Sequence, residues 1–282
     1  PENWLTYSGS YSSIRHSLLD QISPSNVEDL KLAWVFQARS LENFTATPLV
    51  VDGIMYVTQA PNDVVALDAK TGRVFWVYNY TPSADARPCC GRVNRGVAIL
   101  GDTLFMATLD AQLIAIDAVT GRPIWKTAVG DAGQGYAMTL APLVVGDKVI
   151  VGVAGGEYGI RGYIAAYDAA SGSEVWRFYT IPGPGEPGHE TWEGDSWKYG
   201  GAPVWLTGSY DPDLNLTYWG IGNPSPDWNP EQRPGDNLYS DSVVALDVRT
   251  GKLQWYFQFT PNDVHDWDAT EPVLLVDTKF QG

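Results

Sequence analysis

"ALDAKTGRVFW", residues 66–76, decides the fold because the chain contains three close copies of it. The copies are "AIDAVTGRPIW" (115–125), "AYDAASGSEVW" (166–176) and "ALDVRTGKLQW" (245–255). Each carries Asp, then Thr or Ser, then Gly, and ends on Trp, with the aspartates at positions 68, 117, 168 and 247. A unit of about 50 residues therefore repeats, with one longer interval, and periods of this size indicate propellers or solenoids.

Short apolar runs around tight turn pairs precede three of the copies. They are "LVVDGIMYV" (49–57), "AILGDTLFM" (98–106) and "LVVGDKVIV" (143–151), and such runs predict β-hairpins. Each run leads into a strand that ends at the repeated Asp, then a turn, and then a further strand that ends at Trp. Four antiparallel strands in about 50 residues make one propeller blade, so we predict an all-β propeller.

A fifth tryptophan, Trp34 in "LKLAWVF" (30–36), has the context of the last strand of one more blade. The other strands of that blade are either missing or supplied from the far terminus. We therefore expect about five blades, within a single partial propeller domain over residues 1–282. We interpret the repeated residues as structural, because Asp can bond to the turn backbone, Gly supplies a positive φ, and Trp packs between sheets.

The composition is that of an ordinary globular protein, with 44% hydrophobic and 18% charged residues. The net charge of −15 argues against binding to nucleic-acid phosphates and suits a basic protein partner or a cation. No apolar run approaches the roughly 18 residues that suggest a membrane span. The chain begins on Pro1 without a leader-like segment, so we expect a mature or truncated product. The only two cysteines are adjacent, and their count does not settle the redox compartment.

The longer interval between the third and fourth copies is rich in Pro, Gly and Trp, and regular strands tolerate so many prolines poorly. It contains "IPGPGEPGHETWEGDSWKYGGAPVW" (181–205) and "YWGIGNPSPDWNPEQRPGDN" (218–237). Long ordered loops on a rigid ring often carry binding sites. The aromatic side chains offer flat faces to a flat ligand, and a Trp-rich lid that packs on itself is an equal alternative.

Five motifs that occur in a fixed order make a specific resemblance. They are "PCCGRVNRG" (88–96), "VAGGEYGIRG" (153–162), "TWEGDSWKYGG" (191–201), "YWGIGNPSPDW" (218–228) and "TPNDVHDWD" (260–268). Among Trp-bearing blades, this set resembles the methanol and ethanol dehydrogenases that depend on pyrroloquinoline quinone (PQQ), over essentially the whole chain. Members of that family are eight-bladed propellers of roughly twice this length, so the resemblance implies the N-terminal half of such a protein.

The resemblance implies a metal ion beneath PQQ, held by Glu157 in "GGEYG", Asn223 in "GIGNP" and Asp266 in "VHDWD". Hard oxygen ligands suit Ca²⁺ or a similar cation, which would polarise the reactive quinone carbonyl as a Lewis acid. Asp266 would also be the general base that takes the alcohol proton while hydride passes to the quinone. Taken singly, each of these residues reads as a surface or turn residue, whereas the ordered set favours the ligand role.

Asp268 bears on which metal binds. Calcium-using relatives usually carry a small or uncharged residue two positions after the base, whereas lanthanide-using relatives carry a second Asp there. A trivalent ion gains more than a divalent one from an additional carboxylate. We therefore expect a lanthanide as the first choice and Ca²⁺ as the second, with a turn-capping role for Asp268 as the alternative.

For PQQ, the resemblance assigns Trp205 in "GGAPVW" as the indole on which the cofactor lies, with Cys89 and Cys90 as a disulfide over the opposite face. Neighbouring Cα atoms lie about 3.8 Å apart, closer than an ordinary disulfide prefers, so this bond would stiffen a tight ring. Arg95 matches an arginine that bonds the quinone oxygens and stabilises the reduced anion. The residues that would hold the PQQ carboxylates are Thr139, Ala154, Gly155 and Gly156.

Departures from the family pattern bear on the affinity for PQQ. Thr45 stands where relatives usually have a Glu that bonds the cofactor, and Glu42 could replace it only if the loop shifted. Pro203 stands where relatives often have a Thr, and Ala154 replaces a common Ser.

These observations predict a PQQ-dependent alcohol dehydrogenase that passes electrons to a soluble cytochrome c, with this fragment inactive on its own. No Cys-x-x-Cys-His haem motif occurs, so the electron acceptor is expected on a separate chain or in the missing half. One alternative is a noncatalytic propeller scaffold for proteins, which needs neither the cysteine pair nor the metal-ligand set. Another is a quinoprotein sugar dehydrogenase, against which the cysteine pair argues.

The resemblance also carries expectations about the cell and the assembly. A disulfide implies an oxidising compartment such as the periplasm. We expect a small alcohol as substrate, no nucleic-acid partner, and a homodimer as one assembly open to the protein. Because an open propeller leaves sheet faces and an edge uncovered, we expect the isolated half to be poorly soluble.

Overall fold

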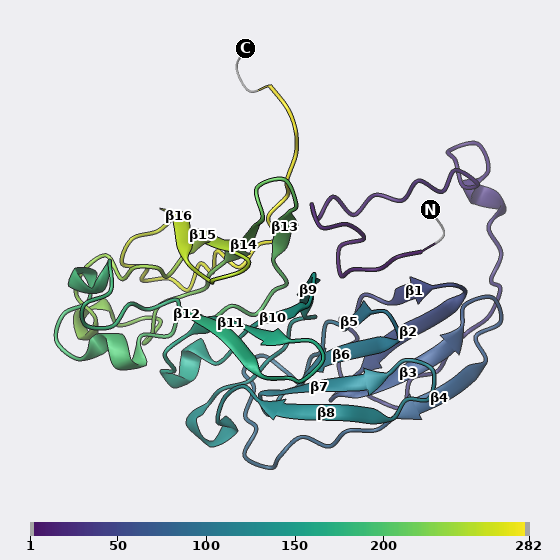
Figure 1. Cartoon of the computed structure of the whole chain (residues 1–282), viewed down its shortest axis with the longest axis horizontal. Helices are drawn as coiled ribbons and strands as arrows, with labels where there is room; N and C mark the ends of the chain where they lie inside the picture. The colour runs from purple at the N-terminus through teal and green to yellow at the C-terminus, as the bar shows by residue number, and fades with distance from the viewer. Residues whose placement is uncertain (1–2, 280–282) are drawn as a thin grey trace.

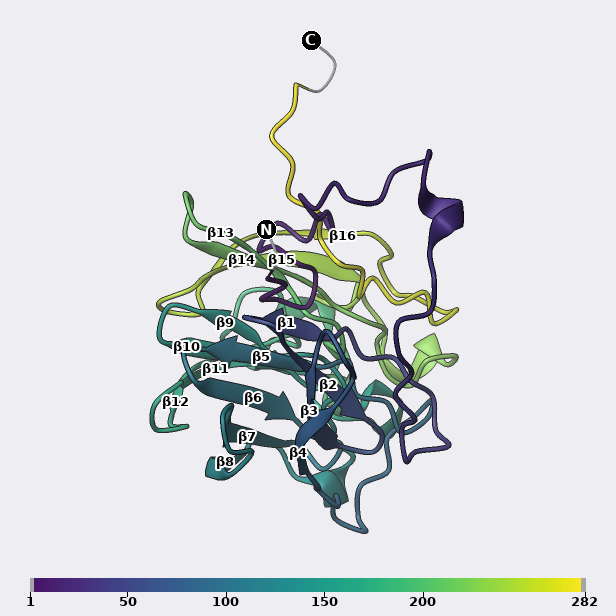
Figure 2. The same cartoon turned by 90° about the vertical axis from the view of Figure 1, so that its right-hand side faces the viewer.

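The computed structural model describes residues 3–279, and within them the chain forms four antiparallel sheets of four strands each. Each sheet uses four strands that are consecutive in the chain, and neighbours in sequence are neighbours in the sheet. The sheets follow one another along an arc in chain order (Figures 1 and 2). The predicted all-β architecture of successive propeller blades is confirmed.

The strands of the four sheets are as follows. The first sheet contains β1 (Leu49–Val51), β2 (Ile54–Gln59), β3 (Asp63–Asp68) and β4 (Val74–Tyr78). The second contains β5 (Val97–Leu100), β6 (Thr103–Ala107), β7 (Gln112–Asp117) and β8 (Pro123–Ala128). The third contains β9 (Leu143–Val145), β10 (Lys148–Gly152), β11 (Tyr163–Asp168) and β12 (Glu174–Tyr179). The fourth contains β13 (Ser209–Asp211), β14 (Leu216–Gly220), β15 (Ser242–Asp247) and β16 (Leu253–Gln258).

Short 3-10 helices interrupt the loops between these strands. Within the described residues they lie at Val27–Asp29, Ala132–Gln134, Gly156–Tyr158, His189–Thr191, Ser196–Tyr199 and Pro230–Gln232. In the same part of the chain, no helix has the length and apolar character needed to cross a membrane. The largest buried apolar cluster extends across the second, third and fourth sheets, so adjacent blades share one core.

The repeated motif forms the same turn in every sheet. In the second sheet, Oδ1 of Asp117 accepts hydrogen bonds from the backbone N–H groups of Val119 (3.1 Å) and Thr120 (2.6 Å). Hydrogen bonds from the Thr120 side chain and backbone hold the pKa of Asp117 below its usual value. The register shifts by a bulge just before each repeated Asp, at Ala66/Leu67, Ala115/Ile116, Ala166/Tyr167 and Ala245/Leu246. The structural interpretation of this Asp is therefore confirmed.

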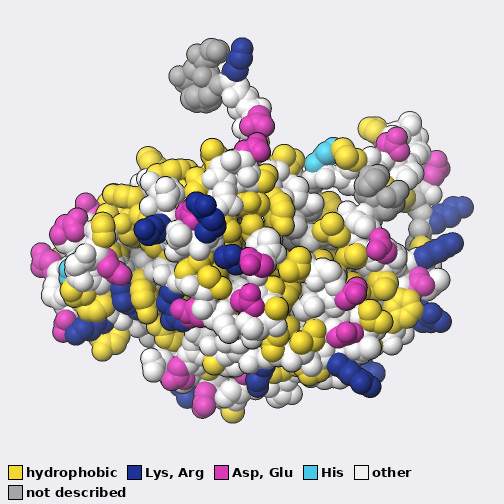
Figure 3. Space-filling view, viewed as in Figure 1, with side chains coloured by type: hydrophobic (Ala, Val, Ile, Leu, Met, Phe, Trp, Pro, Cys, Tyr) yellow, Lys and Arg dark blue, Asp and Glu magenta, His cyan; other side chains and the backbone are white. Residues whose placement is uncertain are grey.

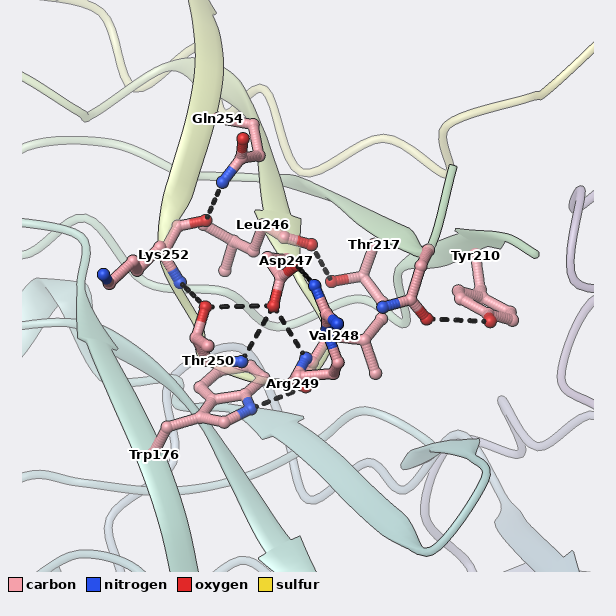
Figure 4. Close-up of polar contacts among 11 residues, drawn as sticks. Trp176, Tyr210, Thr217, Leu246, Asp247, Val248, Arg249, Thr250, Lys252 and Gln254 are labelled. Carbon is pink, nitrogen blue, oxygen red and sulfur yellow. Dashed lines mark hydrogen bonds and ion pairs between the residues drawn. The ribbon is translucent and has the colours of Figure 1, made fainter. Parts of the chain in front are cut away.

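Each docked tryptophan reaches the motif turn of the next sheet. Trp176 donates from Nε1 to the carbonyl oxygen of Val248 at 2.8 Å, beside the turn that Asp247 closes (Figure 4). Gly251 has a φ of +68°, and a Cβ there would stand 2.5 Å from the Trp176 ring. Both the backbone conformation and the close approach of the indole therefore require glycine. The same pairing joins Trp34 to Gly72, Trp76 to Gly121 and Trp125 to Gly172.

Trp34 docks as a blade tryptophan without lying in a strand. Its Nε1 donates to the carbonyl oxygen of Ala69 at 3.2 Å, yet residues 30–38 form no strand. The reason is physical: a strand needs a hydrogen-bonded neighbour, and no segment among residues 3–279 pairs with this one. Of the expected five or so blades, the described residues therefore form four complete sheets, and the remaining blade is represented only by this docked segment, which is not the predicted strand.

The last strand of the arc leaves its aromatic side chains exposed. On β16, Trp255, Tyr256 and Phe257 have 44%, 44% and 58% of their surface exposed. Figure 3 shows that hydrophobic side chains also spread over much of the face turned toward the viewer. These surfaces agree with the expected uncovered faces of an open propeller, although solubility itself stays a prediction.

Candidate cofactor and metal site

A cavity of about 310 Å³ lies where loops from all four sheets converge. The loops involved precede β1, β5, β9 and β13, connect β10 to β11, and follow β16. The volume is at the lower end of the range for small-molecule sites. The lining residues are Asn43, Thr45, Pro88, Cys89, Cys90, Val93, Arg95, Ala137, Thr139, Ala154, Gly155, Glu157, Pro203, Trp205 and Asp268.

Backbone hydrogen bonds join successive loops around the cavity. The N–H of Arg95 donates to the carbonyl oxygen of Thr139 at 3.1 Å. Ala137 and Ala154 exchange a pair of such bonds, at 3.1 and 2.8 Å. Side chains on these loops therefore rest on a connected backbone rather than on independently moving loops.

Arg95, Thr139 and Trp205 form the polar and aromatic wall of the cavity. The Arg95 guanidinium carbon lies 4.8 Å from the centroid of the Trp205 ring, in a cation–π contact. Its Nη1 donates to the carbonyl oxygen of Thr139 at 3.3 Å, and Thr139 Oγ1 donates to the carbonyl oxygen of Trp205 at 3.4 Å. Burial lowers the pKa of Arg95, but guanidinium titrates so far above neutral pH that it stays charged.

Cys89 and Cys90 form a disulfide on the same cavity. Both sulfur atoms and a carboxylate oxygen of Glu157 lie within 4.8 Å of one another. A bonded disulfide is not a thiolate and does not ligate a metal as one, so this grouping places Glu157 beside the disulfide rather than forming a metal site. The predicted pairing of the adjacent cysteines is therefore present in the structure.

Asn223 presents an unpartnered oxygen from a buried position. Its side chain is 1% exposed, and its Oδ1 has no hydrogen-bond donor among the described residues. Its backbone N–H donates to Oδ1 of Asp268 at 3.0 Å, and its Nδ2 donates to Oδ1 of Asp227 at 2.7 Å. Because a buried acceptor without a donor costs about 1–3 kcal/mol, this oxygen is suited to a cation.

The acidic residues around Asn223 repel one another. Burial raises the pKa of Glu157, and the negative charge of Asp266 raises it further. Burial also raises the pKa of Asp268, to about 6, against the hydrogen bond from the Asn223 backbone. The charges of Asp266 and Glu157 add to that rise. These three carboxylates therefore share one region of negative potential, in which a cation would be stabilised.

Glycines allow the ligand loops to approach closely. A Cβ on Gly222 would lie 2.1 Å from Oδ1 of Asp268, so any side chain there would displace this carboxylate. A Cβ on Gly156 would lie 2.9 Å from Pro203 and 3.2 Å from Oδ1 of Asn223. The glycines in "GIGNP" and "GGEYG" thus keep the space around the candidate ligands free.

Most of the predicted residues meet in this region. Nine of those assigned to PQQ or metal line the cavity, and three do not: Gly156, Asn223 and Asp266. Gly156 and Asn223 lie buried behind it, and Asp266 is exposed, in the left-handed region with a φ of +59°. Asp can adopt this conformation more readily than most residues. The individual ligand and cofactor roles stay predictions.

The departures also have structural positions. Thr45 lines the cavity and donates from Oγ1 to the carbonyl oxygen of Asn94 at 3.2 Å, whereas Glu42 is exposed and is not a lining residue. Thr45, which the resemblance matches to the family glutamate, therefore lies on the cavity, and Glu42 does not replace it there. Pro203 lines the cavity and packs on Gly156.

Some residues at the site had no role predicted from the sequence. Asp227 contacts Asn223, although it stands in a quoted motif without an assigned role. Beside the predicted base, His265 contacts both Trp228 (5.7 Å between centroids) and Trp267 (4.6 Å). Both tryptophans are more than 60% exposed. The density of tryptophan in these loops was the available signal for this aromatic cluster.

Comparison with known proteins gives a consistent result. The family model described as "Glucose/ethanol/alcohol dehydrogenase, beta-propeller domain" matches residues 4–282. Quinohemoprotein alcohol dehydrogenase ADH IIB of Pseudomonas putida is 44% identical, over 99% of this chain and 43% of that protein. A lanthanide-dependent methanol dehydrogenase of Methylorubrum extorquens is 42% identical, over 96% of this chain and 49% of that protein.

Solved structures show the same similarity. A europium-containing methanol dehydrogenase superposes with a TM-score of 0.93 at 40% identity, over 100% of this chain and 53% of that one. The quinohemoprotein alcohol dehydrogenase of Comamonas testosteroni gives a TM-score of 0.93 at 40% identity, over 100% and 44%. The chain therefore spans about half the length of the curated relatives it matches.

Proposed function

This chain belongs to the glucose/ethanol/alcohol dehydrogenase family of PQQ β-propellers, and on that premise we propose that the full-length protein oxidises primary alcohols to aldehydes with PQQ. The observation that carries the proposal is a single cavity lined by Trp205, Arg95 and the adjacent-cysteine disulfide, which Glu157 and Asp268 also line. A protein-binding scaffold would have no need of this combination, so it is not favoured.

The residues present fit a metal ion as well as a flat cofactor. Glu157, Asp266 and Asp268 would supply carboxylate oxygens, and Asn223 would supply its amide oxygen, to which no described residue donates a hydrogen bond. An all-oxygen set suits a hard cation. We propose a lanthanide as the preferred ion and Ca²⁺ as the second, because an additional carboxylate stabilises a trivalent ion more than a divalent one.

Each side chain would have a distinct task in the reaction. When bound, PQQ accepts the two electrons of the alcohol, and the cation polarises its quinone carbonyl. A carboxylate oxygen of Asp266 would take the hydroxyl proton of the alcohol, a role suited to its raised pKa and exposed position. Arg95 would place its fixed charge near the quinone oxygens, while Trp205 and the disulfide would hold the ring system flat.

The wider setting of the reaction is proposed from the same features. A soluble cytochrome c would take the electrons, either as a separate chain or through a part of the protein beyond these residues. The adjacent-cysteine disulfide supports an oxidising compartment, and we propose the periplasm. The homodimer stays a prediction, which light scattering of the full-length protein would check.

Metal-dependent turnover tests the proposal. Full-length protein reconstituted with PQQ should oxidise a primary alcohol in an artificial-dye assay, faster with La³⁺ or Ce³⁺ than with Ca²⁺. Asp268→Ala should remove the lanthanide advantage and leave the calcium-supported rate in place. Absence of turnover with all of these ions would overturn the enzyme assignment, and equal loss of both rates in the variant would overturn the role of Asp268.

A further inference from the structure

Asn223 has four polar groups, two in its backbone and two in its side chain, and three of them form hydrogen bonds. Its backbone N–H donates to Asp268, and its backbone carbonyl accepts from the N–H of Ala202 at 2.8 Å. Its Nδ2 donates to Oδ1 of Asp227 at 2.7 Å and, over a longer distance, to the carbonyl oxygen of Pro224 at 3.4 Å. The remaining group, Oδ1, is buried and has no donor among the described residues.

The contact with Asp227 determines which end of the amide faces which way. An amide side chain has a donating and an accepting end of nearly equal size, so packing alone does not choose between its two orientations. An ionised carboxylate can only accept hydrogen bonds. Asp227 therefore selects the orientation in which NH₂ points toward it and Oδ1 points away, toward the loop that carries Gly156.

Asp227 is itself fixed through its backbone by a buried cation. Arg233 is 0% exposed, and it donates from Nη2 to the carbonyl oxygen of Asp227 at 3.1 Å and from Nε to that of Pro226 at 3.0 Å. These bonds use main-chain atoms, so they survive replacement of the Asp227 side chain.

We propose that Asp227 is a positioning residue that holds the Asn223 side chain with its carbonyl oxygen presented to the bound cation. The inference rests on the proposed metal role of Asn223 and adds to it the group that orients this ligand. Partners that orient a metal ligand in this way commonly change metal affinity by about 10–100-fold when they are removed.

Metal binding by the full-length protein tests this inference. The affinity for Tb³⁺ is measured by competition with a chelator for the wild type, Asp227→Ala, Asp227→Asn and Asn223→Ala. We expect Asp227→Ala to weaken binding about 10–100-fold, and Asp227→Asn to weaken it less, because an amide oxygen can still accept from Nδ2. Asp195→Ala, which removes an exposed carboxylate elsewhere, is the control and should leave the affinity unchanged.

Two further readouts separate positioning from general damage. In the variant Asp227→Ala, luminescence decay of bound Tb³⁺ in H₂O and D₂O should report an additional bound water, because the amide oxygen no longer occupies its place. The double variant with Asn223→Ala should bind no more weakly than Asn223→Ala alone, since both changes remove one interaction. Thermal unfolding of the metal-free proteins should be alike for the wild type and Asp227→Ala.

The possible failures are distinguishable. If Asn223→Ala weakens Tb³⁺ binding and Asp227→Ala does not, the positioning role is wrong while the proposed metal site stands. If Asp227→Ala and Asp227→Asn weaken it equally, Asp227 acts only through its charge and the inference is overturned. If Asn223→Ala leaves binding unchanged, the proposed metal site itself is wrong, and the inference falls with it.

Discussion

Asp241 should make the stability of this protein fall as pH rises. The side chain immediately precedes β15, is 0% exposed, and has no hydrogen-bond donor to either carboxylate oxygen among the described residues. Burial raises its pKa to about 8, and the negative charges of Asp263 and Asp268 contribute, with Arg233 opposing. A buried carboxylate with these surroundings is disfavoured in its charged form.

The sign and size of the effect follow from the two pKa values of Asp241. The folded-state value of about 8 lies above the reference value of 3.8, so at intermediate pH the folded protein holds a proton that the unfolded chain has released. The free energy of unfolding therefore falls as pH rises, by about 1.4 kcal/mol per pH unit. The stabilisation is complete below about pH 4, and about 4 kcal/mol is lost between about pH 5 and pH 8.

Asp241→Asn tests this expectation because the amide keeps the shape and does not titrate. Guanidinium unfolding of the metal-free full-length wild type and variant is measured at several pH values between about 5 and 8. As pH rises, the free energy of unfolding of the variant should increase relative to that of the wild type by about 1.4 kcal/mol per pH unit. Asp241→Ser should give the same slope with a different offset, since packing changes do not depend on pH. A difference that stays constant over this range would refute the reasoning.

Two further changes test the docking of the blades and the cofactor wall. Gly251→Ala should lower the free energy of unfolding by about 1–3 kcal/mol more than Gly146→Ala, because both glycines have positive φ but only Gly251 lies against Trp176; equal losses in chemical denaturation would contradict the docking argument. Trp205→Ala should weaken PQQ binding at least about tenfold, since it removes a stacking face and the cation–π partner of the cavity arginine; an absorbance titration that gives unchanged affinity would exclude this tryptophan from the cofactor site.

The blades could be predicted because their determinants are local. An Asp that bonds to its own turn, a Gly at positive φ and a Trp ten residues beyond the start of the motif recur in sequence as they recur in space. Trp34 shows the limit of this reasoning. Its docking on Gly72 follows from the motif, but a strand requires a partner, which lies outside the local pattern.

At the site, only the residues that the ordered motifs match to the family could be predicted. The family resemblance predicted that Glu157 and Asp268 belong to one site, and both line the same cavity although loops from different sheets supply them. Asp227 and Asp241 were missed for a common reason: their properties depend on what lies around them after folding. Asp227 lies between Pro226 and Trp228, and Asp241 lies between two serines, so each reads as a surface residue in the sequence. Only the folded chain shows that Asp227 accepts a hydrogen bond from the Asn223 amide and that Asp241 is buried without a donor among the described residues.

The carboxylates at this site repel one another, and neighbouring donors and a cation offset that repulsion only in part. The backbone N–H of Asn223 stabilises the carboxylate of Asp268, and Arg233 offsets the charges of Asp227 and Asp241. Even so, the pKa values of these aspartates remain raised, because the effect of burial is larger than that of the hydrogen bond and of Arg233. The result is concentrated negative potential beside the Asn223 amide oxygen, which has no hydrogen-bond donor in the described part of the chain. A cation at that point would satisfy the oxygen and lower the repulsion together, so metal binding and folding stability should be coupled in this protein.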